Sequence, residues 1–207
     1  MKENLTEIVF ILDESGSMYN LVNDTIGGFN SFIDAQKEEV GEANVTTVAF
    51  STTHRYIHEG VNLKDLIALN SKDYRPNGGT ALLDTIGSTI LDLGRKLDEL
   101  GEGYKPSKVI FVITTDGEEN ASREFTRAKI KEMIELQTNT YNWQFLFLGA
   151  NIDAVSTAES FGILRSFACN YTASSVGTES VYSGLSKTVS SYREGEAVLD
   201  GWSDEIK

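Results

Sequence analysis

The chain has 207 residues, of which 40% are hydrophobic and 24% are charged, and its formal net charge is −13. This composition is typical of one globular domain with a full core, and it excludes a disordered chain. The negative charge argues against binding to nucleic acid or to anionic membranes, and it favours cations or basic partners.

Several features of the sequence bear on where the protein works. Residues 1–10 lack the long apolar segment of a signal peptide, and no apolar run is long enough to span a bilayer. The single cysteine, Cys169, cannot form an internal disulfide, which fits a reducing compartment. We therefore expect a cytoplasmic protein without a membrane or nucleic-acid partner, and we favour a monomer.

The first half of the chain begins with a predicted strand over Ile8–Leu12. This run is short, β-branched and aromatic, and it ends in a polar turn, which is typical of a strand buried on both faces. Apolar residues at helical spacing then predict a helix over about residues 21–39. Strands are predicted over 45–50 and 55–61, and the short connection between them predicts a hairpin, so that one of the pair runs antiparallel.

The second half alternates helices with buried strands. The predicted helices cover residues 83–100, 123–137, 154–161 and 178–192, and the predicted strands cover residues 109–115, 143–148 and 166–170. This alternation predicts an α/β fold with a doubly wound, Rossmann-like sheet, mostly parallel with one antiparallel edge strand and helices on both faces. We expect a single domain over 1–207, with its core over about 7–192 and a loosely attached tail over 195–207.

Oxygen-bearing side chains follow the first buried strand. Asp13, Ser15 and Ser17 alternate along the chain, so an extended backbone places them on one side, and Gly16 permits a turn that brings them together. Hard oxygen donors at the carboxyl end of a parallel strand suit Mg²⁺, with Mn²⁺ or Ca²⁺ as alternatives, rather than zinc. Taken alone, the same residues also describe an ordinary serine-rich turn.

A second buried strand also ends in a carboxylate, at Asp116. Ligands of doubly wound sheets sit beyond the carboxyl ends of the strands, where neighbouring crossovers part, so we expect these two strand tips to be neighbours. Two facing carboxylates repel each other unless a cation lies between them. We expect a third contribution from the glycine-containing loop 76–82, in which Thr80 opens the next helix with its hydroxyl free.

The chain resembles the von Willebrand factor type A (vWA) family in the three parts of its metal-ion-dependent adhesion site (MIDAS), here Asp13-x-Ser15-x-Ser17, Gly79-Thr80 and Thr115-Asp116-Gly117. The parts stand in family order, and the resemblance covers residues 7–192 approximately. A lone domain without signal or anchor is similar to the cytoplasmic bacterial or phage members. The resemblance implies that one Mg²⁺ is surrounded, directly or through water, by Asp13, Ser15, Ser17, Thr80 and Asp116.

Two further acidic positions lie near these residues. Asp84 stands one helical turn beyond Thr80, so we expect it to support the site from behind the ligands. We interpret Glu118 and Glu119 as part of a solvated turn next to the site.

The resemblance implies a non-enzymatic, Mg²⁺-dependent protein-binding module. Three neutral hydroxyls and two carboxylates leave the ion under-neutralised, with an exchangeable position that accepts an Asp or Glu of a protein partner. We expect no catalytic residue and no organic cofactor.

Two alternatives stay open. The first is a Mg²⁺-dependent phosphoryl-transfer enzyme of the haloacid dehalogenase type with Asp13 as nucleophile; that chemistry needs a second acid where this chain has Ser15. The second is a scaffold with a vestigial site, and the five intact ligand positions count against it.

Overall fold

The computed structural model describes residues 1–198, 202–203 and 206. Six strands form one sheet in the order β3-β2-β1-β4-β5-β6. Its strands are β1 (Lys2–Asp13), β2 (Glu42–Phe50), β3 (His54–Asn62), β4 (Pro106–Thr115), β5 (Gln144–Ala150) and β6 (Ala168–Tyr171). Neighbouring strands run parallel except for β2 and β3, which form an antiparallel pair at one edge. The predicted mostly parallel sheet with one antiparallel edge strand is confirmed.

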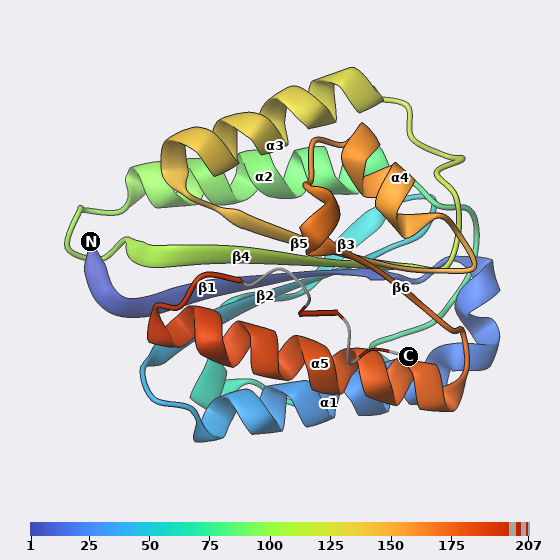
Figure 1. Cartoon of the computed structure of the whole chain (residues 1–207), viewed down its shortest axis with the longest axis horizontal. Helices are drawn as coiled ribbons and strands as arrows, with labels where there is room; N and C mark the ends of the chain where they lie inside the picture. The colour runs from blue at the N-terminus through green and yellow to red at the C-terminus, as the bar shows by residue number, and fades with distance from the viewer. Residues whose placement is uncertain (199–201, 204–205, 207) are drawn as a thin grey trace.

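Helices cover both faces of the sheet, as predicted (Figure 1). One face is covered by α1 (Val22–Glu38) and α5 (Ser175–Glu194), and the other by α2 (Leu82–Glu99), α3 (Arg127–Tyr141) and α4 (Ala154–Ser160). Short 3₁₀ turns add η1 (Gly16–Leu21), η2 (Leu63–Asp65) and η3 (Arg165–Phe167). None of the helices within the described ranges has the length and apolar character needed to cross a bilayer.

Strand β1 is buried on both faces, because apolar side chains occupy every position from Ile8 to Leu12. Ile8, Phe10 and Leu12 belong to the core layer under α1 and α5, whereas Val9 and Ile11 belong to the layer under α2, α3 and α4. All five side chains are fully buried. This burial confirms the prediction for the first strand and fixes its tip, at Asp13, in the centre of the sheet.

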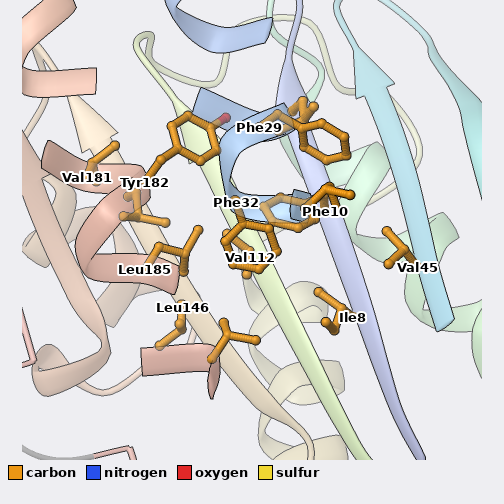
Figure 2. Packing of buried hydrophobic residues seen from close by; sticks show 14 of the residues in the cluster. Ile8, Phe10, Phe29, Phe32, Val45, Val112, Leu146, Val181, Tyr182 and Leu185 are labelled. Atoms are coloured by element: carbon orange, nitrogen blue, oxygen red, sulfur yellow. The ribbon is translucent and has the colours of Figure 1, made fainter. Parts of the chain in front are cut away.

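An aromatic cluster holds α1 against β1. The ring of Phe10 makes edge-to-face contacts with Phe29 at 5.1 Å and Phe32 at 4.9 Å between centroids (Figure 2). Tyr182 of α5 lies against Gly28, where a Cβ atom would stand only 2.2 Å from the Tyr182 ring. The missing side chain at Gly28 therefore lets α1 and α5 approach each other closely over the same core layer.

Helix α3 begins later than predicted, at Arg127 rather than near Arg123. Thr126 caps it, with its hydroxyl accepting a hydrogen bond from the Lys129 amide. The amides of Arg123, Glu124 and Phe125 donate instead to the carboxylate of Asp84. A tertiary contact thus outweighs the local helical pattern at these three residues.

The predicted tail over 195–207 falls in part on residues 199–201, 204–205 and 207, which lie outside the described residues. Of the described ones, Ile206 is buried and would stand 2.7 Å from a Cβ atom on Gly184 of α5. The indole of Trp202 donates to the Ser166 carbonyl at 2.7 Å. The organisation of 1–207 as a single domain stays a prediction.

Candidate metal centre

The two buried strand tips are neighbours, as the sequence predicts. β1 pairs in parallel with β2 on one side and with β4 on the other, so the crossovers part between β1 and β4. Leu12 is in register with Thr114, which brings Asp13 beside Thr115. The Thr115 hydroxyl donates to Asp13 Oδ2 at 2.6 Å, across 102 residues of sequence. The Asp13 carboxylate is therefore oriented by a side chain of β4.

Four of the predicted ligand side chains form one continuous hydrogen-bond network. The Ser15 amide donates to Asp13 Oδ1 at 2.7 Å, and the Ser15 and Ser17 hydroxyls lie 3.0 Å apart. The Ser17 hydroxyl donates to Asp116 Oδ1 at 2.5 Å. Ser15 keeps an extended backbone and the chain turns at Gly16 into η1, which is the curl expected from the glycine.

The fifth predicted side chain, Thr80, comes from the loop before α2. A Cβ atom on Gly117 would lie 3.4 Å from Thr80 Oγ1 and 3.7 Å from Ser17 Oγ, so both hydroxyls lie over the same glycine next to Asp116. Within the described part of the chain, the Thr80 hydroxyl makes no hydrogen bond, which matches the expectation of a free hydroxyl. The expectation that Thr80 opens the helix is wrong, because α2 begins at Leu82.

Glu119 has a structural role that the sequence interpretation missed. One carboxylate oxygen accepts from the Leu83 amide at 2.9 Å and so caps α2, while the other accepts from the amides of Ala121 and Ser122. The interpretation of Glu119 as a solvated turn residue is therefore wrong, whereas Glu118 is exposed. The spacing between a loop acid and a distant helix start gives no local sequence signal for such a cap.

Asp84 binds the loop that follows β4. Its carboxylate accepts three amide hydrogen bonds from 123–125 and so ties that segment to α2. In the same loop, the side-chain oxygen of Asn120 accepts from the Thr80 backbone amide at 2.9 Å, and the backbone amide of Asn120 donates to the Thr80 carbonyl at 3.1 Å. Asp84 thus holds the loop that fixes the backbone of Thr80, and its support of a metal site stays a prediction.

The two carboxylates are buried without a basic partner. Asp13 is 1% exposed and Asp116 is 7% exposed. Burial raises the pKa of both groups, and the nearby Asp116 raises that of Asp13 further, against the lowering by hydrogen bonds from Ser15 and Thr115. No ion pair within the described ranges involves either carboxylate. A bound cation would remove the cost of ionising them.

The chemistry of the cluster fits a hard divalent cation. It brings two carboxylates and three hydroxyls together and contains neither imidazole nor thiolate, a donor set that suits Mg²⁺, Mn²⁺ or Ca²⁺. Nowhere in residues 1–198, 202–203 and 206 do three or more His, Cys, Asp or Glu side chains gather into one group that could hold a metal ion. A metal ion at this position would therefore take hydroxyl oxygens in addition to the two carboxylates.

Comparison with known proteins identifies the fold. No family model and no curated protein matches the sequence. Among solved structures, proximal thread matrix protein 1 from the mussel byssus, described with a zinc-occupied MIDAS motif, superimposes with a TM-score of 0.63 at 13% identity. The match covers 92% of this chain and 47% of that one, so the chain spans about half the length of the mussel protein.

Two further structures agree with this match. The vWF domain of the type V pili tip protein Mfa5 from Porphyromonas gingivalis gives a TM-score of 0.64 at 11% identity, over 94% of this chain and 98% of that one. The manganese-loaded TRAP protein of Plasmodium vivax gives 0.53 at 15% identity, over 72% and 58%. Together with the sheet order and the helices on both faces, these matches show that the chain has the fold of a von Willebrand factor type A domain.

Proposed function

We propose that this chain is a non-enzymatic protein-binding module that depends on Mg²⁺. The ion would be held by Asp13, Ser15, Ser17, Thr80 and Asp116. The observation that carries this proposal is a pair of buried carboxylates without a basic partner, surrounded by hydroxyls at the tips of two adjacent strands. Such a pair is costly to ionise alone and favourable around a cation.

The preference for Mg²⁺ rests on the donor set, and Mn²⁺ or Ca²⁺ would be held by the same oxygens. Two similar structures carry zinc and manganese according to their descriptions, which supports a divalent ion in general. Because three of the five proposed ligands are neutral hydroxyls, the protein side would leave part of the ion's charge unbalanced. When bound, the ion would offer an exchangeable position to a carboxylate from outside.

The partner would therefore be a protein that presents an Asp or Glu side chain. Ser17 is exposed, and Tyr19, which follows it in η1, is 74% exposed, so the proposed ligands border the protein surface. One unit charge against a net charge of about +1 at roughly 4 Å contributes about 4 kcal/mol before desolvation, at an effective dielectric of about 20. The surrounding surface must add contact area for a stable complex.

Phosphoryl transfer is the less favoured function. The position two residues after Asp13, where a second acid would be needed, is occupied by Ser15, whose hydroxyl lies 3.0 Å from that of Ser17. No Lys or Arg of the described residues forms an ion pair with Asp13. Incubation with an activated phosphate ester and Mg²⁺ tests this function, and turnover that is lost in Asp13→Asn would favour it over binding.

The metal part of the proposal is tested by melting the protein in EDTA and in Mg²⁺, together with calorimetric titration. If free Mg²⁺ stands about tenfold above its dissociation constant, mass action stabilises the fold by roughly 1.4 kcal/mol. An unchanged melting temperature, with no heat of binding, would contradict a metal centre. The binding part is tested by Mg²⁺-dependent capture of proteins from the source cell, with Asp13→Ala as the control bait.

Substitution of Thr80 by alanine is expected to weaken Mg²⁺ binding while the fold persists. The Thr80 hydroxyl makes no hydrogen bond within the described residues, so its removal costs little stability. Calorimetry of Mg²⁺ binding measures the loss, and Thr140→Ala, an exposed position of α3, is the matched control. Wild-type affinity in Thr80→Ala would remove the loop from the proposed site.

A further inference from the structure

We propose that the ion pair between Arg55 and Glu14 is a clamp that positions the loop carrying Thr80 against the metal ligands of β1. This inference rests on the proposed metal centre and names positioning residues for it. Neither residue is a proposed ligand. Glu14 lies between Asp13 and Ser15 in sequence, and Arg55 is the second residue of the return strand β3.

The clamp consists of contacts that the side chains of Arg55 and Glu14 make with each other and with the backbone of the loop before Thr80. One guanidinium nitrogen of Arg55 donates to both carboxylate oxygens of Glu14, at 2.8 and 3.0 Å, and to the Asp73 carbonyl at 2.6 Å. The same Glu14 carboxylate accepts a hydrogen bond from the Arg75 amide. The β1 turn, the β2–β3 hairpin and the loop before Thr80 therefore meet at one carboxylate.

Backbone contacts continue from this point toward Thr80. The Asn77 amide donates to the Glu14 carbonyl at 2.8 Å, and the Gly16 amide donates to the Gly78 carbonyl at 3.1 Å. The Gly79 amide donates to the Thr52 hydroxyl at 2.9 Å. Thr80 is thus the end of a segment whose path is set by the β1 turn and by the hairpin.

Burial makes the ion pair important for this path. Glu14 is 5% exposed, whereas the side chain of Arg55 is 47% exposed. If Arg55 is removed, a buried carboxylate loses its basic partner and either moves toward water or rearranges its neighbours. Either change would pull on the Arg75 amide and displace the loop.

Electrostatics and positioning predict opposite effects on metal binding. Arg55 is a positive charge near the proposed centre, so its removal should strengthen cation binding if charge alone matters. If the ion pair positions the loop, its removal should weaken binding, because Thr80 is no longer held in place. The sign of the change in metal affinity therefore distinguishes a charge effect of Arg55 from a positioning role.

The experiment titrates Mn²⁺ into wild type, Arg55→Met and Arg75→Met by calorimetry. Arg75→Met is the matched control, because it also removes one positive charge, from the loop before Thr80, but keeps the backbone amide that contacts Glu14. We expect Arg55→Met to bind Mn²⁺ about 10–100-fold more weakly, as is typical when a group that orients metal ligands is lost. Arg75→Met is expected to bind at least as tightly as wild type.

Arg55→Lys keeps the charge but lacks the fork that reaches Glu14 and Asp73 together, so it is also expected to bind more weakly. This variant keeps the test valid if Arg55→Met does not fold. Hydrogen exchange without metal gives an independent measurement, in which the amides of Arg75 and Asn77 should exchange faster in both Arg55 variants.

The outcomes separate this inference from the function on which it rests. If wild type binds no Mn²⁺, the metal centre fails and the clamp with it. If wild type binds but Arg55→Met and Arg55→Lys bind as tightly or more tightly, with unchanged exchange at Arg75 and Asn77, the clamp is refuted and the metal centre stands.

Discussion

Asparagine in place of Asp13 is expected to raise stability in EDTA and to abolish stabilisation by Mg²⁺. Asp13 is buried beside Asp116, and burial raises its pKa, so its ionised form is unfavourable without a cation. The amide is neutral: its oxygen can accept from the Ser15 amide, and its NH2 group can donate to the Thr115 hydroxyl, whose own proton can then go to the Gly117 carbonyl 3.1 Å away. The expected loss of Mg²⁺ affinity is large, because one unit charge against a divalent ion at about 4 Å contributes roughly 8 kcal/mol before desolvation at an effective dielectric of about 20.

The measurement is a melting experiment with and without Mg²⁺, repeated from neutral pH to below about pH 4 and combined with calorimetry of Mg²⁺ binding. We expect at least about a 100-fold loss of affinity, equivalent to roughly 2.7 kcal/mol. A carboxyl group whose pKa is raised in the folded state loses its contribution to stability as pH rises through that pKa. The gain of Asp13→Asn in EDTA should therefore be present at neutral pH and vanish below about pH 4, where the wild-type group is protonated both folded and unfolded. A variant that is less stable than wild type in EDTA at neutral pH would contradict the assigned burial cost.

Truncation of Phe10 to alanine is expected to give the largest loss of fold stability. Phe10 is fully buried in the middle of β1 and packs edge-to-face on Phe29 and Phe32. Loss of the ring removes its transfer free energy and leaves a cavity under α1, at a cost of about 3–5 kcal/mol. That is a large share of the roughly 5–15 kcal/mol by which domains are usually stable.

Urea denaturation followed by circular dichroism measures the change as a lower midpoint. Tyr104→Ala is the matched control, because it removes an aromatic ring that is 74% exposed, and its effect should stay within about 0.5 kcal/mol. A Phe10→Ala midpoint close to that of the control would mean that α1 closes onto β1 and fills the space.

The sequence predicts the fold well where apolar pattern and chain direction act together. Ile8–Leu12 is continuously apolar because both faces of β1 are covered, and the hairpin follows from the short connection between β2 and β3. The meeting of Asp13 with Asp116 follows from the same logic, since parallel strands bring their carboxyl ends to one edge. These predictions need only the order of the elements.

The sequence fails where a side chain acts on a distant backbone. Asp84 draws the amides of 123–125 away from helical geometry, and Glu119 caps α2 across the loop. The contacts of Arg55 with Glu14 and Asp73 are of the same kind, because they join residues 41 and 18 positions apart. Such contacts depend on where loops lie in space, and a single sequence holds no periodic signal for them.

The hydrogen bonds Thr115 to Asp13 and Ser17 to Asp116 span 102 and 99 residues of chain. Synthesis starts at the amino terminus, so β1 is made before β4. Neither hydrogen bond can form until β4 has been synthesised. Loop closure over that distance is slow compared with local helix formation. The nascent polypeptide is therefore without its proposed cation pocket until Asp116 has been translated, and acquisition of the ion would mark the pairing of β1 with β4.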